Sequence, residues 1–206
     1  MLSTTMLLVG LCSSTGPALD QAGSSDSLVK LYQGGKTWQE FFDGARARRE
    51  TWKENYQIGQ PAPEAVARAR AVPGSWRVLV VAEDWCGDSA NTIPYLVRLV
   101  EQVPSLELRI VNSTVGRWVM VKHPTPDGRA ATPTVVILDA DGAERGCFVE
   151  RPAALRAWAA DNRGKLDDDG FQKGKMAWYR NDRGRATVAD FVALLESAGG
   201  GGSGCG

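Results

Sequence analysis

The stretch that decides the fold reads Trp76-Arg77-Val78-Leu79-Val80-Val81-Ala82-Glu83-Asp84-Trp85-Cys86-Gly87-Asp88-Ser89. Its β-branched, apolar first half, residues 76–82, predicts a buried strand. In the segment that follows it, apolar residues recur at spacings of three and four, at Ile93, Leu96, Val97 and Val100. This period predicts an amphipathic helix over 87–102. Cys86 therefore lies where a strand passes into the first turn of a helix.

A cysteine at such a junction meets unpaired backbone N–H groups and the positive end of the helix dipole, both of which stabilise an anion. Because a thiol is nucleophilic only as thiolate, we expect Cys86 to be reactive. Asp84 and Asp88 are like charges that oppose ionisation, but we expect their carboxylates to turn to solvent. The alternative is a buried structural cysteine. A reactive, exposed thiol is favoured over this alternative because Gly87, on one side of Cys86, lets another chain approach the sulfur, and Trp85 lies on the other side.

The chain resembles the thioredoxin superfamily over roughly residues 37–197. It is similar in particular to a bacterial branch of thioredoxin-like proteins whose active site reads Trp-Cys-Gly-Asp-Cys. The segments that carry the resemblance are Trp85-Cys86-Gly87, Pro94, Thr132-Pro133-Thr134-Val135-Val136-Ile137-Leu138, Arg151-Pro152 and residues 178–187. The resemblance implies that Pro133 is a cis proline facing Cys86. It also implies that the exposed backbone of Thr132 receives a substrate peptide as an extended strand.

Ser89 stands where that branch has its second cysteine. In a dithiol site the second thiol attacks the mixed disulfide from within the molecule, at high effective concentration. Ser89 cannot do this, although its hydroxyl can donate a hydrogen bond to the Cys86 thiolate. We therefore expect monothiol (CxxS) exchange, in which glutathione or another thiol releases the product as co-substrate and no cofactor is bound.

The expected site has Cys86 and Ser89 as catalytic residues. The expected substrate-binding residues are Trp85, Gly87, Asp88, Thr132 and Pro133, and no metal ligands are expected. Expected partners are protein or low-molecular-weight thiols and disulfides. Two alternatives remain: a peptide-binding or partner-trapping module in which turnover is absent, and a degenerate relative whose Cys86 is unreactive.

Composition excludes other classes of function. The chain has 206 residues, of which 43% are hydrophobic and 23% charged, as in an ordinary globular domain. Its 24 basic and 24 acidic residues leave no net charge to attract nucleic acid or anionic lipid. We expect a monomer without a membrane span. The arginines at 180, 183 and 185 could bind an anion, although a solvated surface is the default interpretation.

The remaining cysteines are Cys12, Cys147 and Cys205, and the single histidine is His123. Their spacing indicates neither a disulfide framework nor a zinc site, and a Cys–His pair is not expected. His123 lies among prolines and is expected in a surface loop. We expect Cys147 in the core and Cys205 in an inert tail, with the alternative that Cys205 swings back to resolve a mixed disulfide at Cys86.

Three parts of the chain are expected. We expect residues 1–29 to be a disordered leader or a weak signal-like segment. We expect 30–198 to be the thioredoxin-like domain with helical extensions, and 199–206 to be a flexible glycine-rich tail. No Lys or Arg precedes Lys30, so the basic start of a signal peptide is missing and a cytoplasmic location is favoured over export.

The expected fold class is α/β, with a mixed central sheet flanked by helices and with extra helices at both ends. Further strands are expected at 106–111 (parallel to the first), 134–138 and 144–149, the last two joined by a hairpin turn at 139–142. Further helices are expected at 38–49, which begins with the capping box Thr37-Trp38-Gln39-Glu40, and at 63–71, 152–162, 171–180 and 187–198.

Overall fold

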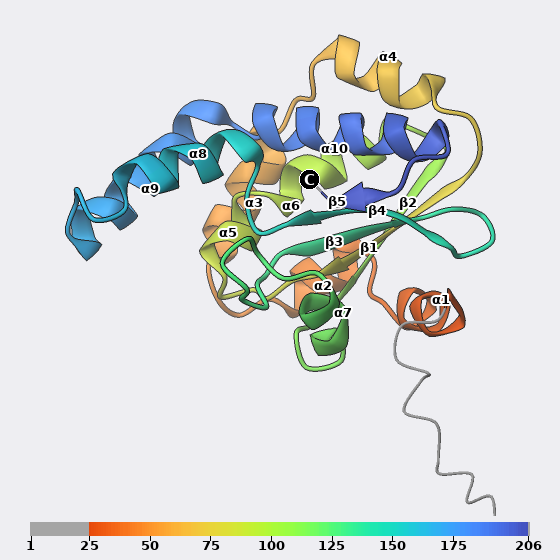
Figure 1. The fold of residues 1–206 in the computed structure, drawn as a ribbon, viewed down its shortest axis with the longest axis horizontal. Helices are drawn as coiled ribbons and strands as arrows, with labels where there is room; N and C mark the ends of the chain where they lie inside the picture. The colour runs from red at the N-terminus through yellow and green to blue at the C-terminus, as the bar shows by residue number, and fades with distance from the viewer. Residues whose placement is uncertain (1–24, 206) are drawn as a thin grey trace, which may run out of the picture.

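The computed structural model describes residues 25–205 and consists of a central sheet with helices on both faces (Figure 1). The strands are β1 (Trp76–Val81), β2 (Leu106–Val111), β3 (Thr134–Leu138), β4 (Glu144–Val149) and β5 (Gly204–Cys205). The first helices are α1 (Ser25–Gln33), α2 (Trp38–Gly44), α3 (Arg49–Ile58), α4 (Pro63–Ala71), α5 (Gly87–Ala90) and α6 (Ile93–Val100). The later ones are α7 (Arg117–Lys122), α8 (Ala153–Asn162), α9 (Asp168–Asp182) and α10 (Arg185–Gly199).

The sheet has the order β2-β1-β3-β4-β5 and is mixed. Strands β1 and β2 are parallel, as their helical connection predicts, with Trp76 opposite Leu106. Strand β3 runs antiparallel to both β1 and β4, and β5 lies parallel to β4. The expected α/β class with a mixed central sheet is confirmed.

Strand β1 is buried on both faces because it lies inside the sheet and helices cover each side. Val78 and Val80 belong to the larger core, whereas Leu79 and Val81 belong to the smaller core on the opposite face. This two-sided burial explains why the strand reads as a continuous apolar run, without polar alternation.

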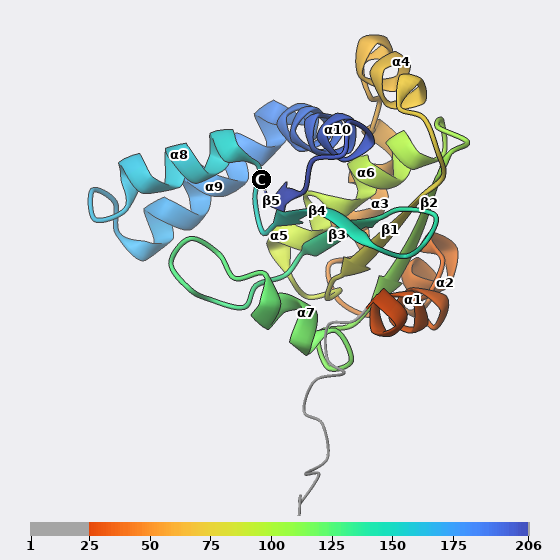
Figure 2. The ribbon, with the colours of Figure 1, turned by 45° about the vertical axis from the view of Figure 1, so that its right-hand side comes forward.

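Different helices cover the two faces. Helices α3, α4, α6 and α10 pack over the larger core, and α1 and α7 lie against the other face. Helices α8 and α9 form a hairpin that extends sideways from the sheet, as both views show (Figures 1 and 2). This hairpin supplies residues to the candidate site described below.

The first expected helix is shorter than predicted. The capping box is present, with the Thr37 hydroxyl accepting from the Glu40 N–H and the Glu40 carboxylate accepting from the Thr37 N–H. Helix α2 nevertheless ends at Gly44, and a separate helix, α3, begins at Arg49. Arg48, at the N-cap of α3, has φ 49, a left-handed conformation that an uninterrupted helix excludes.

The helix expected over 87–102 is divided in two. Helix α5 ends at Ala90 and α6 begins at Ile93, with Pro94 in its first turn. Proline is well suited to a first helical turn, where its missing N–H needs no partner, so the chain breaks before it and does not kink around it. The short α5 places the Cys86 junction on a separate turn.

The ends of the domain differ from the expected boundaries. Residues 25–29 belong to α1, in which Leu28 is buried, and the rest of the expected leader, with Cys12, lies outside the described residues. Within the segment expected as a flexible tail, Gly199 ends α10, and Gly204 and Cys205 form β5, with Cys147 opposite Cys205. These two cysteines are joined by a disulfide, which sequence spacing did not suggest because β4 and the tail are distant in the chain.

His123 is buried, contrary to the expectation of a surface loop position. It is the C-cap residue of α7, and its Nε2 lies 3.1 Å from Oε1 of Glu144 in β4. Within residues 25–205, none of the helices is long and apolar enough to cross a bilayer.

Candidate functional site

Cys86 lies at the N-cap of α5 and is partly exposed. Its sulfur accepts a hydrogen bond from the backbone N–H of Ser89 at 3.4 Å. Its S–H donates to the Thr132 carbonyl oxygen at 3.2 Å. Among the cysteines in the described part of the chain, Cys86 alone is a free thiol. The Ser89 N–H can thus stabilise a Cys86 thiolate, and the Thr132 carbonyl oxygen can accept from the Cys86 thiol.

The loop that precedes β3 brings Thr132 to Cys86, although the two residues are 46 positions apart. The Thr132–Pro133 peptide bond is cis, as the family resemblance implied. The Pro133 carbonyl accepts a hydrogen bond of 2.7 Å from the Glu150 N–H, which ties this loop to the end of β4. The Thr132 carbonyl oxygen, at a cis peptide bond, therefore lies next to the Cys86 sulfur.

Asp88 is buried, and this corrects the expectation that its carboxylate turns to solvent. Its Oδ1 accepts from the Tyr179 hydroxyl at 2.9 Å, and its Oδ2 lies 3.2 Å from both Lys175 Nζ and Arg151 Nη2. Two cations thus compensate the carboxylate two positions after Cys86, so its field at the sulfur is offset by positive charge. In this arrangement Asp88 anchors α5 and does not face a substrate.

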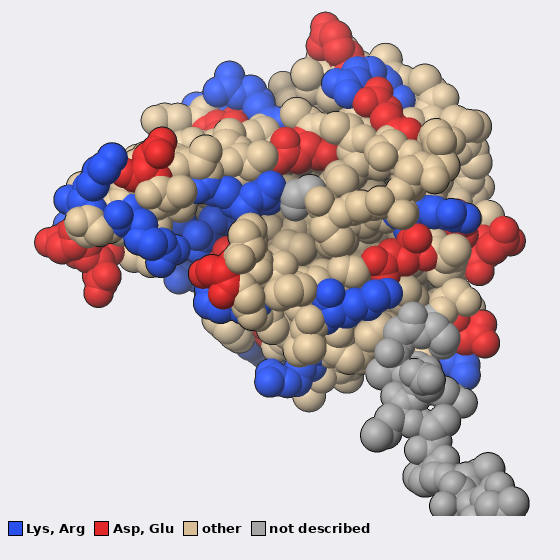
Figure 3. Space-filling model, in the orientation of Figure 1, with Lys and Arg blue, Asp and Glu red and all other residues tan. Residues whose placement is uncertain are grey.

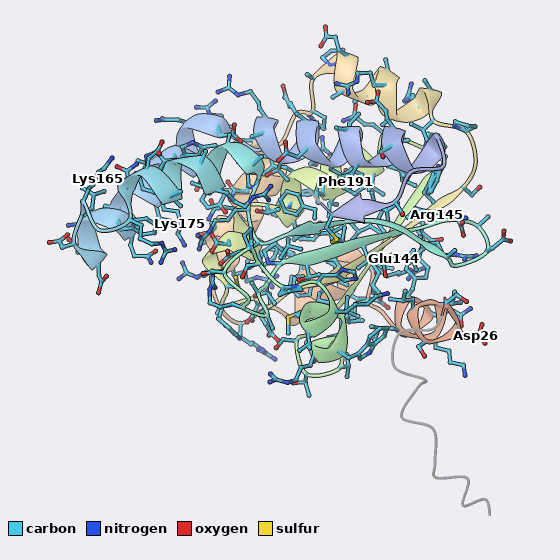
Figure 4. The ribbon with its side chains drawn as sticks, viewed as in Figure 1. Asp26, Glu144, Arg145, Lys165, Lys175 and Phe191 are labelled. Atoms are coloured by element: carbon cyan, nitrogen blue, oxygen red, sulfur yellow. A yellow bond between two sulfur atoms is a disulfide. The ribbon has the colours of Figure 1, made fainter. Side chains whose placement is uncertain are left out.

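The partners of Asp88 come from distant elements. Lys175 and Tyr179 lie one helical turn apart on α9, and Arg151 precedes α8. Lys175, labelled in Figure 4, lies on the hairpin at the side of the sheet. Burial, and then the Asp88 charge, raises the pKa of Tyr179 well above its usual value, so the hydroxyl stays a donor. For Arg151, burial opposes the charged form, but Asp88 and Glu150 raise the pKa overall.

Asp84 is also held by the protein. Its Oδ2 accepts from the backbone N–H groups of Arg46 and Ala47 at 2.6 and 3.0 Å. Burial alone would raise the pKa of the Asp84 carboxyl, but these hydrogen bonds lower it below its usual value. The carboxylate therefore points at the turn between α2 and α3.

Trp85, Gly87 and Ser89 surround the sulfur in different ways. Trp85 is 60% exposed, the largest exposed fraction among the exposed large hydrophobic residues of the described chain. Gly87 is partly buried, and a Cβ on it would lie 3.7 Å from the Arg48 guanidinium carbon. Ser89 is fully buried, and its Oγ has no hydrogen-bond partner within residues 25–205. The contact from Ser89 to Cys86 is thus made by its backbone, not by the expected hydroxyl.

Arginines line two adjoining hollows beside the site. The first, of about 320 Å³, includes Arg48, Arg180 and Arg183 in its lining, and the second, of about 460 Å³, includes Arg180, Arg183 and Arg185. The only acidic residue of the described chain in either lining is Glu54. Figure 3 shows basic side chains gathered along the α8–α9 hairpin on one face of the molecule.

Arg48 connects these hollows to the cysteine. Its Nε donates to the Trp85 carbonyl oxygen at 2.7 Å, and its guanidinium group lies over Gly87. An anionic group bound in the first hollow would therefore lie next to the loop that carries Cys86. The sequence left an anion site at Arg180, Arg183 and Arg185 as an alternative to a solvated surface, and it gave no signal that Arg48 joins them.

The comparisons with known proteins agree with this geometry. The family model described as thioredoxin matches residues 35–163, more than half of the chain. The chain belongs to the thioredoxin family. No curated protein matches the chain.

Two solved structures share the thioredoxin-like fold with this chain. One is a protein of unknown function from Pseudomonas aeruginosa, 21% identical, with a TM-score of 0.65; the match covers 82% of this chain and 97% of that one. The other is an HIV epitope scaffold, 20% identical, with the same TM-score and the same coverage. At this identity the likeness concerns the fold alone. The two matches therefore carry no information about the chemistry of this thioredoxin-family chain.

Proposed function

We propose that this protein catalyses thiol–disulfide exchange by a monothiol route through Cys86, with glutathione as co-substrate. The observation that carries the proposal is the position of the Cys86 sulfur, a free thiol at a helix N-cap, 3.2 Å from the carbonyl oxygen that precedes Pro133. A partly exposed thiol next to the backbone carbonyl of the partly exposed Thr132 supports contact with a substrate disulfide.

The reaction consists of two exchanges. In the first, the Cys86 thiolate attacks one sulfur of a disulfide RS–SR′, a Cys86–SR bond forms, and R′S⁻ leaves. In the second, a glutathione thiolate attacks the SR sulfur or the Cys86 sulfur. Attack on SR frees Cys86 directly and gives the disulfide of R with glutathione. Attack on Cys86 releases RS⁻ and leaves Cys86 glutathionylated, so that a further glutathione is needed.

The backbone around the sulfur changes its role during this cycle. In the resting thiol, Cys86 donates to the Thr132 carbonyl; as a thiolate it can only accept, and the Ser89 N–H remains as its donor. Thr132 O is then available to an N–H of a peptide substrate. The exposed Trp85 side chain offers apolar contact at the same edge.

The arginine-lined hollows support glutathione as the thiol that completes the cycle. Glutathione carries two carboxylates, and Arg48, Arg180 and Arg183 lie around the hollow nearest to Cys86. Arginine pairs with carboxylates in a planar, two-bond geometry, which gives orientation as well as attraction. This feature distinguishes a glutathione-dependent exchange protein from one that uses any small thiol.

A glutathione-dependent turnover assay with a glutathionylated peptide tests the proposal. The wild-type protein should release the peptide thiol catalytically, and Cys86→Ser should abolish turnover while Ser89→Ala retains it. Cys205→Ser should also retain turnover, since release by glutathione needs no second protein thiol. A Cys86→Ser variant as active as the wild type would overturn the proposal.

The exposed Trp85 also supports a second function, a peptide-binding module in which Cys86 is incidental or traps a partner covalently. In that case wild-type protein shows no turnover, yet binds peptide. Cys86→Ser then keeps its peptide affinity, whereas Trp85→Ala loses it. Equilibrium binding of an extended peptide to these two variants separates the two functions.

A further inference from the structure

Three potential metal ligands lie together on the far side of β3 from the strand that leads to Cys86. They are His123 at the end of α7, Cys147 in β4 and Cys205 in β5, and their ligand atoms all lie within 4.8 Å of one another. Cys205 Sγ is 3.5 Å from His123 Nδ1, and Cys147 and Cys205 are disulfide-bonded. His123 and Cys147 are buried.

Glycines allow this cluster to form. Gly146 pairs with Gly204 in the ladder that brings Cys205 beside Cys147, and a Cβ on Gly146 would lie 3.1 Å from the Gly204 carbonyl oxygen. A larger residue at position 146 would push β5 away. The glycine-rich segment 199–204 also leaves Cys205 free to shift when its bond to Cys147 is broken.

Glu144 faces the other side of the His123 ring. Its Oε1 lies 3.1 Å from His123 Nε2, and its Oε2 lies 2.7 Å from Lys122 Nζ. Glu144, labelled in Figure 4, projects from β4. The Glu144 carboxylate therefore lies beside Nε2, while the other ring nitrogen, Nδ1, is the one that lies 3.5 Å from the Cys205 sulfur. Histidines that bind metals are oriented by such carboxylates.

We propose that, once the Cys147–Cys205 disulfide is reduced, His123, Cys147 and Cys205 bind a zinc ion. A thiol RSH supplies the electrons: two RSH and the disulfide give two cysteine thiols and RS–SR. Zinc binding then replaces the two thiol protons, which pass to solvent. The protein thus holds its C-terminal segment to β4 by a disulfide when oxidised and by a metal ion when reduced.

The distances fit tetrahedral zinc. Zn–N bonds of about 2.0 Å and Zn–S bonds of about 2.3 Å place ligand nitrogen and sulfur roughly 3.5 Å apart. The distance from His123 Nδ1 to Cys205 Sγ is already 3.5 Å. Two thiolates and one imidazole are ligands that zinc prefers, and the exposed position of Cys205 leaves the fourth place to water.

The redox state of the compartment decides which form is present. Thiols are kept reduced in the cytosol, where the metal form would prevail, and oxidised outside it, where the disulfide would prevail. The expectation of no metal site rested on spacing in sequence. That spacing carries no signal here because the ligands come from a helix end, a strand and the C-terminal segment.

Cobalt titration of the full-length protein, reduced with a phosphine and kept free of oxygen, tests the proposal. One equivalent of Co²⁺ should give thiolate-to-cobalt charge-transfer absorption and the visible bands of a tetrahedral site, and Zn²⁺ should displace it. Cys86→Ser should bind equally well because Cys86 is not a ligand. Cys205→Ser should lose the charge-transfer band or weaken binding by at least about 100-fold.

His123→Ala and Glu144→Gln make the test independent of folding. Each variant should still form the Cys147–Cys205 disulfide under oxidation, measured by thiol counting, which shows that β5 still docks. His123→Ala should then lose tetrahedral cobalt binding, and Glu144→Gln should weaken it by about 10- to 100-fold. Absence of charge-transfer absorption in the reduced wild type, or unchanged binding in His123→Ala, would overturn the proposal and leave monothiol exchange at Cys86 unaffected.

Discussion

Asp88 Oδ1 accepts a hydrogen bond of 2.9 Å from the hydroxyl of Tyr179, a residue 91 positions further along the chain. Asp88 belongs to the short helix after Cys86, and Tyr179 belongs to the hairpin formed by α8 and α9. The extra C-terminal helices are thus fastened to the turn that carries the reactive thiol. Their role at the site is to neutralise and anchor the Asp88 carboxylate.

The first prediction concerns this anchor. Asp88→Ala leaves the buried Lys175 without its carboxylate partner and removes one of the two partners of Arg151. Removing one member of a buried ion pair typically costs about 3–5 kcal/mol, so we expect the free energy of unfolding to fall by that amount. Urea unfolding followed by tryptophan fluorescence measures it.

Lys173→Ala is the matched control for Asp88→Ala. Lys173 lies on α9 as Lys175 does, but its ion pair with Asp169 is well exposed. Exposed pairs contribute little because water screens them, so the control should unfold at nearly the wild-type urea concentration. Equal stability of the two variants would show that the Asp88 cluster does not hold α9 to the site.

The second prediction is a pH dependence set by Tyr179. Its pKa in the folded protein is raised well above 10, mainly by burial, whereas in the unfolded chain it is about 10. Below pH 10 both states keep the proton; above it the unfolded chain loses the proton first. Stability is therefore fully present below pH 10 and is lost as the pH rises beyond it.

Tyr179→Phe removes this contribution. Between pH 10 and about 11.5, its unfolding free energy should fall less steeply than that of the wild type, by about 1.4 kcal/mol per pH unit. Between pH 7 and 9 the two curves should run parallel, offset by the lost hydrogen bond. Parallel curves throughout the alkaline range would contradict neutral burial of the hydroxyl.

Strands β1 and β3 were predicted well because they are buried on both faces, whereas β5 was missed and its segment was expected to be a flexible tail. Residues 76–81 and 134–138 are apolar at nearly every position. Their preference for a buried strand can therefore be recognised without knowing their neighbours in the fold. Helix boundaries were predicted less well. The break between α5 and α6 depends on where the chain accommodates Pro94, and helical periodicity continues across the break.

The candidate site was predictable only as far as its local part. Cys86 and Ser89 follow from a motif, and Thr132 and Pro133 follow from the family resemblance. The partners of Asp88 did not follow, because Lys175 and Tyr179 look like surface and core residues of an ordinary helix. The contact of Cys205 with His123 was not predicted either, because contacts between distant elements leave no pattern in a single sequence.

The third prediction tests whether only a resolving thiol is missing. Ser89 is fully buried at the position from which its backbone contacts the Cys86 sulfur. Ser89→Cys replaces a hydroxyl that has no partner among the described residues with a slightly larger, less polar thiol. The variant should form a disulfide between Cys86 and the new thiol, and it should reduce insulin disulfides faster than the wild type does.

Ser89→Ala is the control for that gain. It removes the same hydroxyl without supplying a thiol, so insulin reduction should stay at the wild-type level. Mass spectrometry after oxidation locates the new bond by proteolytic mapping. A Ser89→Cys protein that folds but forms no bond between these positions would show that the two side chains do not face each other.

The fourth prediction follows from the arginine-lined hollows. Arg180 contributes to both, and Arg180→Glu changes the local charge by two units where the carboxylates of glutathione are proposed to bind. The KM for glutathione should rise by about 10-fold, with a smaller effect on kcat, because the variant loses attraction and gains repulsion without touching the sulfur. Raising the salt concentration should narrow the difference between variant and wild type.

Lys165→Glu makes the same change of charge elsewhere on the hairpin. Lys165, labelled in Figure 4, is exposed and lies before α9. Arg180 lies in the last turn of that helix. The helical segment between them, residues 168–180, spans about 18 Å, more than twice the screening length at physiological salt. This variant should therefore keep the wild-type KM. If both variants raise the KM equally, the effect comes from the net charge of the protein, and the hollows beside Arg48 do not bind the co-substrate.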